Sequence, residues 1–204
     1  MLFRSVDENA QNAILLFGGA NRAVTPAYAD EVLAHFSAGD IVLLQNEISA
    51  VPHILRRAAE AGLSVWFNPS PMDDGALACD LSLVSAFLLN EIEGEQLTGT
   101  AEPGAILDRM AEKYPQAAVV LTLGAAGAWY AKGGARAFCP AEKAEAVDTT
   151  AAGDTFTDYF LRGMLDGRTP EEALRLAARA SAIAVSRPGA SPSIPRFSEV
   201  ERGL

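Results

Sequence analysis

The residues best suited to chemistry lie at Ala151-Ala152-Gly153-Asp154. Three small residues lead into a segment with helical periodicity, so the backbone can approach a ligand closely and the first-turn N–H groups can bind an anion. The helix dipole favours an ionised Asp154. A carboxylate beside a phosphate site can accept a proton from an attacking hydroxyl. Spacing alone leaves open the alternative that Asp154 is only a helix N-cap.

The wider segment 148–156, DTTAAGDTF, resembles the signature of the ribokinase (PfkB) family of carbohydrate kinases. The resemblance implies that Ala151, Ala152 and Gly153 form an anion hole and that Asp154 is the catalytic base, near both ATP and the sugar. It also implies ATP-dependent phosphorylation of a sugar hydroxyl, with D-ribose converted to D-ribose 5-phosphate as the first candidate reaction. Kinases for another sugar or a nucleoside remain alternatives.

A second match is Leu89-Asn90-Glu91-Ile92-Glu93, which follows an apolar run and resembles the family's Asn-x-x-Glu element. The resemblance places Asn90 near the nucleotide phosphates and has Glu93 hold Mg²⁺ through water, consistent with the oxygen ligands and retained waters that Mg²⁺ prefers. Alternatively, Asn90 and Glu93 are the two ends of a capping box at a helix start. Both interpretations can hold together.

A third match is TLGAAG at 122–127, which resembles the ATP-lining Thr-x-Gly-x-x-Gly loop of the family. The nucleotide-binding residues implied are Thr122, Leu123, Gly124, Ala125, Ala126 and Gly127. A turn from a strand into a hairpin would also call for glycine here.

The segment 182–193, AIAVSRPGASPS, resembles the C-terminal element of the family, which builds a monovalent-cation site together with the DTT segment. Carried over, the K⁺ ligands are Asp148, Thr150, Ala184, Arg187, Gly189 and Ser193, several of them through backbone carbonyls.

One departure lies near the beginning of the chain. Gln11 occupies the position where ribokinases commonly have a glutamate that contacts ribose. An amide can hydrogen-bond a sugar hydroxyl but carries no charge. We therefore assign Gln11 to the sugar site without assuming strict ribose specificity.

Short β-rich runs alternate with helical patterns, which predicts an α/β fold. The resemblance implies the ribokinase-like three-layer αβα sandwich with a mostly parallel sheet. Strands are expected at 13–17, 41–45, 65–67, 87–89 and 119–122, followed by a hairpin, 128–131 and 135–139, around Gly133-Gly134. Helices are expected at 25–36, 50–61, 104–113, 154–165 and 170–186, and no element is expected ahead of 13–17.

Bulk properties exclude several classes of protein. The 204 residues, half of them apolar, suit one domain over 1–204. A net charge of −10 argues against a nucleic-acid partner. The apolar runs are too short to cross a membrane, and no secretory signal is apparent, so we expect a cytoplasmic protein. Neither the dinucleotide-binding Gly-x-Gly-x-x-Gly arrangement nor a Walker sequence is present.

The resemblance runs from about Val6 to the end of the chain and corresponds to the C-terminal two-thirds of a ribokinase. The family's N-terminal strands, its Gly-Gly sugar loop and its β lid are expected to be missing. Because the lid commonly forms the dimer contact in the family, a homodimer is left open. A truncated, catalytically incompetent nucleotide-binding remnant is the alternative function.

Overall fold

The computed structural model describes residues 2–6 and 12–202, and the chain divides into two compact units, Met1–Val84 and Ser85–Leu204. The single domain expected over 1–204 stays a prediction.

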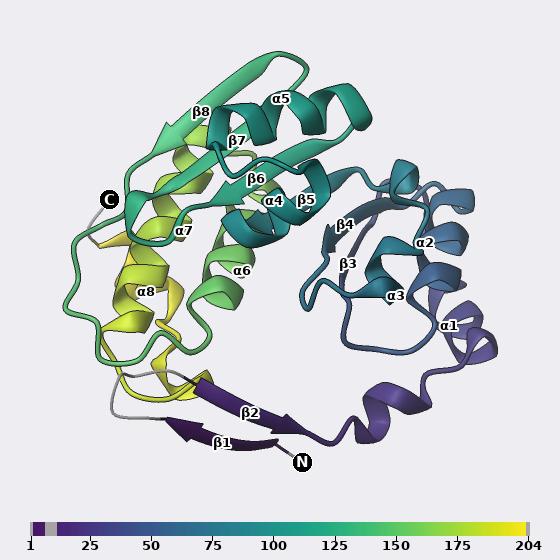
Figure 1. Cartoon of the computed structure of the whole chain (residues 1–204), viewed down its shortest axis with the longest axis horizontal. Coiled ribbons are helices and arrows are strands. Elements are labelled where there is room, and N and C mark those ends of the chain that lie inside the picture. The colour runs from purple at the N-terminus through teal and green to yellow at the C-terminus, as the bar shows by residue number, and fades with distance from the viewer. Residues whose placement is uncertain (1, 7–11, 203–204) are drawn as a thin grey trace. The chain divides into compact units, whose positions relative to one another are not determined.

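The first unit opens with a two-stranded antiparallel sheet, β1 (Leu2–Val6) paired with β2 (Asn12–Leu16) (Figure 1). The sequence analysis missed β1, since a five-residue strand containing Arg4 and Ser5 has no clear alternation of apolar and polar residues. The unit continues with a 3-10 helix (Gly19–Ala23), α1 (Pro26–Leu33), β3 (Ile41–Gln45), α2 (Val51–Glu60), β4 (Ser64–Asn68), α3 (Asp74–Leu77) and a 3-10 turn (Leu81–Leu83).

Strands β3 and β4 pair in parallel through the crossover helix α2. The apolar residues Val51, Ile54, Leu55 and Ala58 recur at helical spacing and are all buried. This stripe packs against β4, in which Val65, Trp66 and Phe67 are buried in succession, so both faces of β4 are covered.

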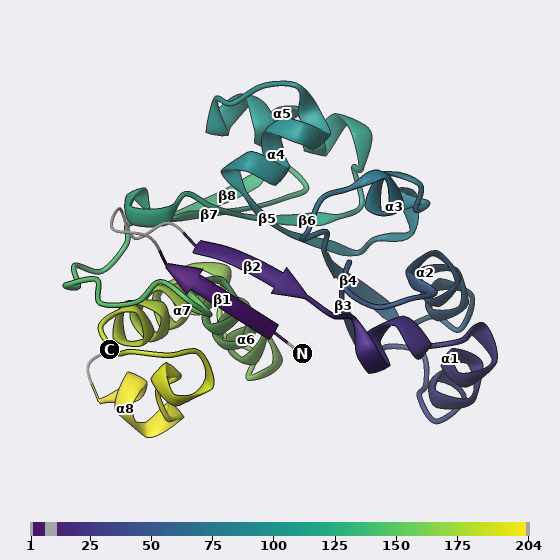
Figure 2. The ribbon, with the colours of Figure 1, turned by 60° about the horizontal axis from the view of Figure 1, so that its bottom comes forward.

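In the second unit, the strand order is β5 (Ala86–Asn90), β6 (Ala118–Thr122), β7 (Ala128–Lys132), β8 (Ala135–Cys139). The pair β5–β6 is parallel, whereas β6–β7 and β7–β8 are antiparallel. The helices are α4 (Glu91–Thr98), α5 (Pro103–Lys113), α6 (Ala152–Leu165), α7 (Pro170–Val185) and α8 (Phe197–Glu201). Figure 2 shows α4 and α5 on one face of these strands and α6 and α7 on the other, which makes three layers.

The helix pair α6–α7 is the most closely packed part of this unit. A Cβ atom on Gly163 of α6 would lie 2.9 Å from the Cβ of Ala173 on α7, so only glycine permits this approach. Helix α7 begins at a capping box between Thr169 and Glu172, and Pro170 is its first residue. At the start of α6, the Ser181 hydroxyl of α7 donates to the carbonyl of Ala152 (3.1 Å), which holds this end of the helix against α7.

Among the described residues, no helix is both long enough and apolar enough to cross a membrane.

Candidate active site

Helix α6 begins two residues earlier than expected, and no side chain caps its start. The N-cap residue is Ala151, which adopts a left-handed conformation (φ 61°) and has no side-chain capping bond. The first amide to donate to the carbonyl of Ala151 is that of Thr155. The Ala152 amide donates to the carbonyl of Thr149 (3.3 Å), and the positive end of the helix dipole favours an anion at this terminus.

Asp154 lies in the first turn of α6 and is exposed. Because Ala151 holds the N-cap position, the alternative that Asp154 is the N-cap is wrong. The Asp154 carboxylate therefore belongs to the same helical turn as the amides that are predicted to bind an anion.

A cavity of about 360 Å³ borders this helix start. Ala152 and Gly153 line it from α6, and Ser181, Ala182 and Val185 line it from α7. A Cβ atom added to Gly153 would meet no atom within 4 Å, so open space adjoins this residue. The start of α6 therefore lies at the wall of a cavity large enough for part of a ligand.

The glycine loop after β6 forms another wall of the cavity, through Thr122, Gly124, Ala125 and Gly127. The Leu123 amide donates to the Gly127 carbonyl (2.8 Å) across a 3-10 turn over Gly124–Ala126. Gly127 has a φ of 120°, and any side chain there would collide with the carbonyl of Cys139. The fold of the loop therefore requires glycine at position 127. Of the six predicted nucleotide-binding residues in the loop, Leu123 and Ala126 do not line the cavity.

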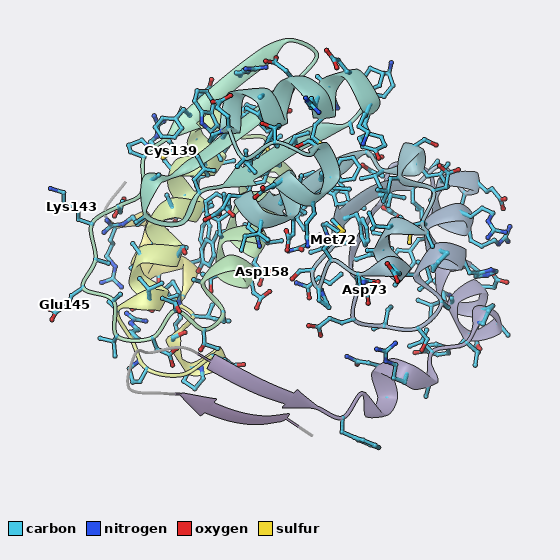
Figure 3. The ribbon with its side chains drawn as sticks, viewed as in Figure 1. Met72, Asp73, Cys139, Lys143, Glu145 and Asp158 are labelled. Carbon is cyan, nitrogen blue, oxygen red and sulfur yellow. The ribbon has the colours of Figure 1, made fainter. Side chains whose placement is uncertain are left out.

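The segment between β8 and α6 covers the cavity on a further side. Ala141, Glu142, Ala144 and Ala146 line the cavity. Figure 3 shows Lys143 and Glu145 projecting outward from the same segment. Ala144 and Ala146 therefore face the cavity and alternate with the outward Lys143 and Glu145, a pattern that the sequence analysis did not use.

One ion pair ties this segment to α7. Arg179 Nη1 lies 3.0 Å from Glu142 Oε2, and Arg179 Nε donates to the carbonyl of Val200 (3.1 Å). Neither residue was predicted, because 37 residues separate them in the sequence and no motif links them.

Asn90 and Glu93 form the capping box of α4. The Glu93 amide donates to Asn90 Oδ1 (2.9 Å), and the Asn90 amide donates to Glu93 Oε2 (3.0 Å). Glu93 is buried, and Asn90 lies opposite Thr122 in the parallel β5–β6 pairing. The capping interpretation is confirmed, and Asn90 adjoins a residue that lines the cavity.

The predicted cation ligands gather around the Asp148 carboxylate. Its Oδ1 accepts from the Thr150 amide (2.9 Å) and hydroxyl (2.6 Å), and its Oδ2 accepts from the Gly189 amide (3.1 Å). The fully buried Ser193 hydroxyl donates to the carbonyl of Ala190 (2.6 Å), one residue beyond Gly189.

The other two predicted ligands lie near the C-terminal end of α7. The carbonyl of Ala184 accepts from the Arg187 amide (3.1 Å), while the Arg187 side chain pairs with Glu199 (2.7 Å). Hydrogen bonds also run from the Val147 and Asp148 amides to the carbonyl of Val185. The fold therefore brings the 147–150 and 184–193 segments together.

The sugar contact and a protein-built metal site were the other features to look for. Gln11, assigned to the sugar, lies outside the described residues. Within the described part of the chain, no group of three or more His, Cys, Asp or Glu side chains could hold a metal ion.

Comparison with known proteins decides the family. The family of pfkB carbohydrate kinases matches residues 2–196, nearly the whole chain. The chain belongs to the pfkB family. This PfkB chain is 38% identical over 207 residues to a ribokinase of Schizosaccharomyces pombe, covering 96% of its own length and 64% of the relative.

Two solved ribokinases show the same fold. The ribokinase of Thermotoga maritima superposes with a TM-score of 0.81 at 32% identity, and the match covers 98% of the PfkB chain and 68% of the other. The Arabidopsis thaliana ribokinase complexed with ribose and ATP gives 0.79 at 29% identity, covering 98% and 67%. These matches confirm the expected three-layer, mostly parallel ribokinase-like fold. The PfkB chain spans about two-thirds of the length of these relatives.

Proposed function

We propose that this chain carries the nucleotide site and the catalytic base of an ATP-dependent sugar kinase. The observation that carries the proposal is the start of α6, where an uncapped helix terminus borders a cavity and Asp154 lies in the same turn. Anion-binding amides and a carboxylate within one helical turn are what phosphoryl transfer to a hydroxyl requires.

In this proposal Asp154 accepts the proton of the attacking sugar hydroxyl. The amides of the first turn of α6, over Ala151, Ala152 and Gly153, hold the negative charge of the transferring phosphoryl group. The bond from the Ser181 hydroxyl to the Ala152 carbonyl holds this helix start on α7, and the Ala152 amide would exchange its long bond to Thr149 for the anion.

ATP is the proposed phosphoryl donor. The cavity is lined mainly by apolar side chains, among them Phe156 and the alanines Ala144, Ala146, Ala178 and Ala182. An apolar slot suits the faces of a purine base. Polar groups at one end, from the Thr122 loop and the α6 terminus, suit the phosphates.

Mg²⁺ fits as an ion held chiefly by the nucleotide phosphates. The described residues offer no three-carboxylate cage, and one oxygen of Glu93 is engaged in the capping box. The protein would contribute a contact from Glu93 to the ion through a bridging water, and Asn90 would lie near the phosphates. When bound, Mg²⁺ supplies charge neutralisation on the phosphates.

K⁺ fits the oxygen-rich cluster around Asp148, in which the proposed ligands are Thr150, Ala184, Arg187, Gly189 and Ser193. Carboxylate, hydroxyl and carbonyl oxygens are the donors that hard cations take. A cation there would supply positive charge beside the anion-binding terminus.

D-ribose is the first candidate acceptor, since ribokinases are about one-third identical to the chain and one of them is described as complexed with ribose and ATP. Gln11 is the proposed sugar contact of this chain. A cytoplasmic location fits the same proposal.

A second candidate function is nucleotide binding without turnover. It is favoured by the coverage of the curated relatives, since the chain accounts for only 64% of the S. pombe ribokinase.

One experiment separates the two functions. ADP formation is measured with Mg-ATP, K⁺ and D-ribose, with a no-sugar control, in the wild type and in Asp154→Asn. Asp158→Asn is the matched control, because it neutralises an exposed carboxylate one turn further along the same helix. Ribose-dependent turnover that is lost only in Asp154→Asn supports the kinase. Turnover retained in Asp154→Asn rejects Asp154 as the base, and ATP binding without turnover in the wild type establishes the second function.

A further inference from the structure

The carboxylate of Glu199 joins the two ends of the loop between α7 and α8. Its Oε1 lies 2.7 Å from Arg187 Nη2, just beyond the end of α7, and its Oε2 accepts from the backbone amide of Arg196 (2.8 Å), just ahead of α8. Helix α8 itself packs against α7 (Figure 1). One side chain of α8 therefore closes the loop that contains the proposed cation ligands Gly189 and Ser193.

Two other contacts fasten this loop, and both come from the region of α6. The Gly189 amide donates to Asp148 Oδ2 (3.1 Å), and the Tyr159 hydroxyl donates to the carbonyl of Pro195 (2.7 Å). Asp148 precedes α6, and Tyr159 belongs to it. The loop is thus held at its middle and at its end, while Glu199 holds its beginning through Arg187.

Arg187 presents an electrostatic problem for a cation site. The guanidinium carries a permanent positive charge and has no acceptor, so the only ligand that Arg187 can offer K⁺ is its backbone carbonyl. A positive side chain on a ligand residue repels the ion, and the repulsion grows where water is partly excluded. The Arg187 and Glu199 side chains are 37% and 35% exposed, so solvent screens this charge only in part.

We propose that Glu199 is a positioning residue for the cation site, a role that rests on the K⁺ site proposed above. Its carboxylate draws the Arg187 guanidinium toward α8 and neutralises the positive charge. Residue 187 then contributes its carbonyl oxygen to K⁺ without an unbalanced positive charge beside the ion. The second oxygen of Glu199, bound to the Arg196 amide, keeps the carboxylate in place for this task.

Glu199→Gln is the variant that tests this role. The side chain keeps its length, but it loses its charge and has one acceptor oxygen in place of two. It can therefore accept from the Arg187 guanidinium or from the Arg196 amide, and not from both. Glu201→Gln is the matched control, because Glu201 also belongs to α8 and also pairs with an arginine, Arg168 (3.1 Å), which lies ahead of α7 and outside the loop.

The measurement is the dissociation constant for ATP as K⁺ is raised at constant ionic strength, with tetramethylammonium chloride as the balancing salt. No sugar is present, so the readout does not depend on turnover. We expect Glu199→Gln to need about three to five times more K⁺ than wild type for half of the full effect, as suits the loss of one partly exposed ion pair. Glu201→Gln should follow wild type, and the unfolding midpoints of all three proteins should nearly coincide.

A double-mutant cycle checks that Glu199 acts through Arg187. Arg187→Met removes the guanidinium and leaves the carbonyl in the chain. Once the guanidinium is gone, adding Glu199→Gln should change the K⁺ requirement no further. A purely structural role of Glu199 in α8 would instead give an effect that adds to that of Arg187→Met.

The outcomes separate this role from the proposed site. An ATP affinity of wild type that ignores K⁺ would reject the cation site and the role of Glu199 together. A wild type that responds to K⁺, with Glu199→Gln responding identically, would reject the role of Glu199 alone. Equal shifts in Glu199→Gln and Glu201→Gln, or additivity in the cycle, would also overturn it, because the effect would then come from the packing of α8.

Discussion

The carboxylate of Asp148 accepts a hydrogen bond from the backbone amide of Gly189, 41 residues further along the chain (3.1 Å). This contact joins the segment ahead of α6 to the loop after α7. The same carboxylate holds Thr150, one residue before the left-handed N-cap Ala151. Asp148 is therefore positioned to couple the 184–193 loop to the anion-binding start of α6.

Replacing Asp148 should uncouple the two segments. We expect Asp148→Ala to weaken ATP binding and to remove any difference between K⁺ and Na⁺, because both the loop contact and the main anionic ligand are lost. Titration calorimetry in the two salts measures this, with Asp166→Ala, an exposed carboxylate at the other end of α6, as the control. An identical response to K⁺ in wild type and Asp148→Ala would remove the cation site from this position.

Breaking the bridge between Glu142 and Arg179 should loosen the wall of the cavity with little effect on stability. Both side chains are partly exposed (27% for Arg179 and 41% for Glu142), so the pair is worth at most about 1 kcal/mol. We expect Glu142→Gln to raise the dissociation constant for ATP while leaving the unfolding midpoint nearly unchanged. Glu145→Gln, on the outward side of the same segment, is the control (Figure 3). Equal ATP affinities in the two variants would mean that the bridge does not position the wall.

Substitutions at the two residues of the capping box should affect different properties, the stability of the fold in one case and the Mg²⁺ dependence of ATP binding in the other. Asn90→Ala removes the acceptor for the Glu93 amide and should lower the free energy of unfolding by about 1 kcal/mol. Glu93→Gln keeps an acceptor for the Asn90 amide but removes the charge, so it should change the Mg²⁺ concentration needed for ATP binding more than it changes stability. Urea unfolding and Mg²⁺ titrations of both variants test this. A Glu93→Gln variant with unaltered Mg²⁺ dependence would leave Glu93 with the capping role alone.

Asp158 predicts a pH-dependent gain in stability. Although its side chain is exposed, the surrounding protein desolvates it and raises the pKa of its carboxyl, and the charge of Asp154 raises it further. A carboxyl whose pKa is raised on folding destabilises the fold progressively as the pH rises from its ordinary pKa through the raised pKa. Asp158→Asn should therefore be more stable than wild type at neutral pH.

The difference between Asp158→Asn and wild type should vanish as the pH falls toward the ordinary value of 3.8. Thermal unfolding across this range measures it. A gain that stays constant with pH would have to come from packing rather than from charge.

The sequence by itself determined the local elements and the residues that carry chemistry. Periodicity predicted most strands and helices, since the stripe of Val51, Ile54, Leu55 and Ala58 or the Thr-Pro start of α7 depends only on near neighbours. The small residues before Asp154 and the spacing of Asn90 and Glu93 indicated the anion site and the capping box for the same reason.

Only the tertiary structure decided which of these segments meet. The bond from Gly189 to Asp148, the bridge from Arg179 to Glu142 and the cavity between α6, α7 and the Thr122 loop join residues far apart in the chain. The contact between Asp30 on α1 and Arg57 on α2 likewise joins residues that no motif links. Long-range contacts are set by the packing of whole elements, which no local pattern encodes.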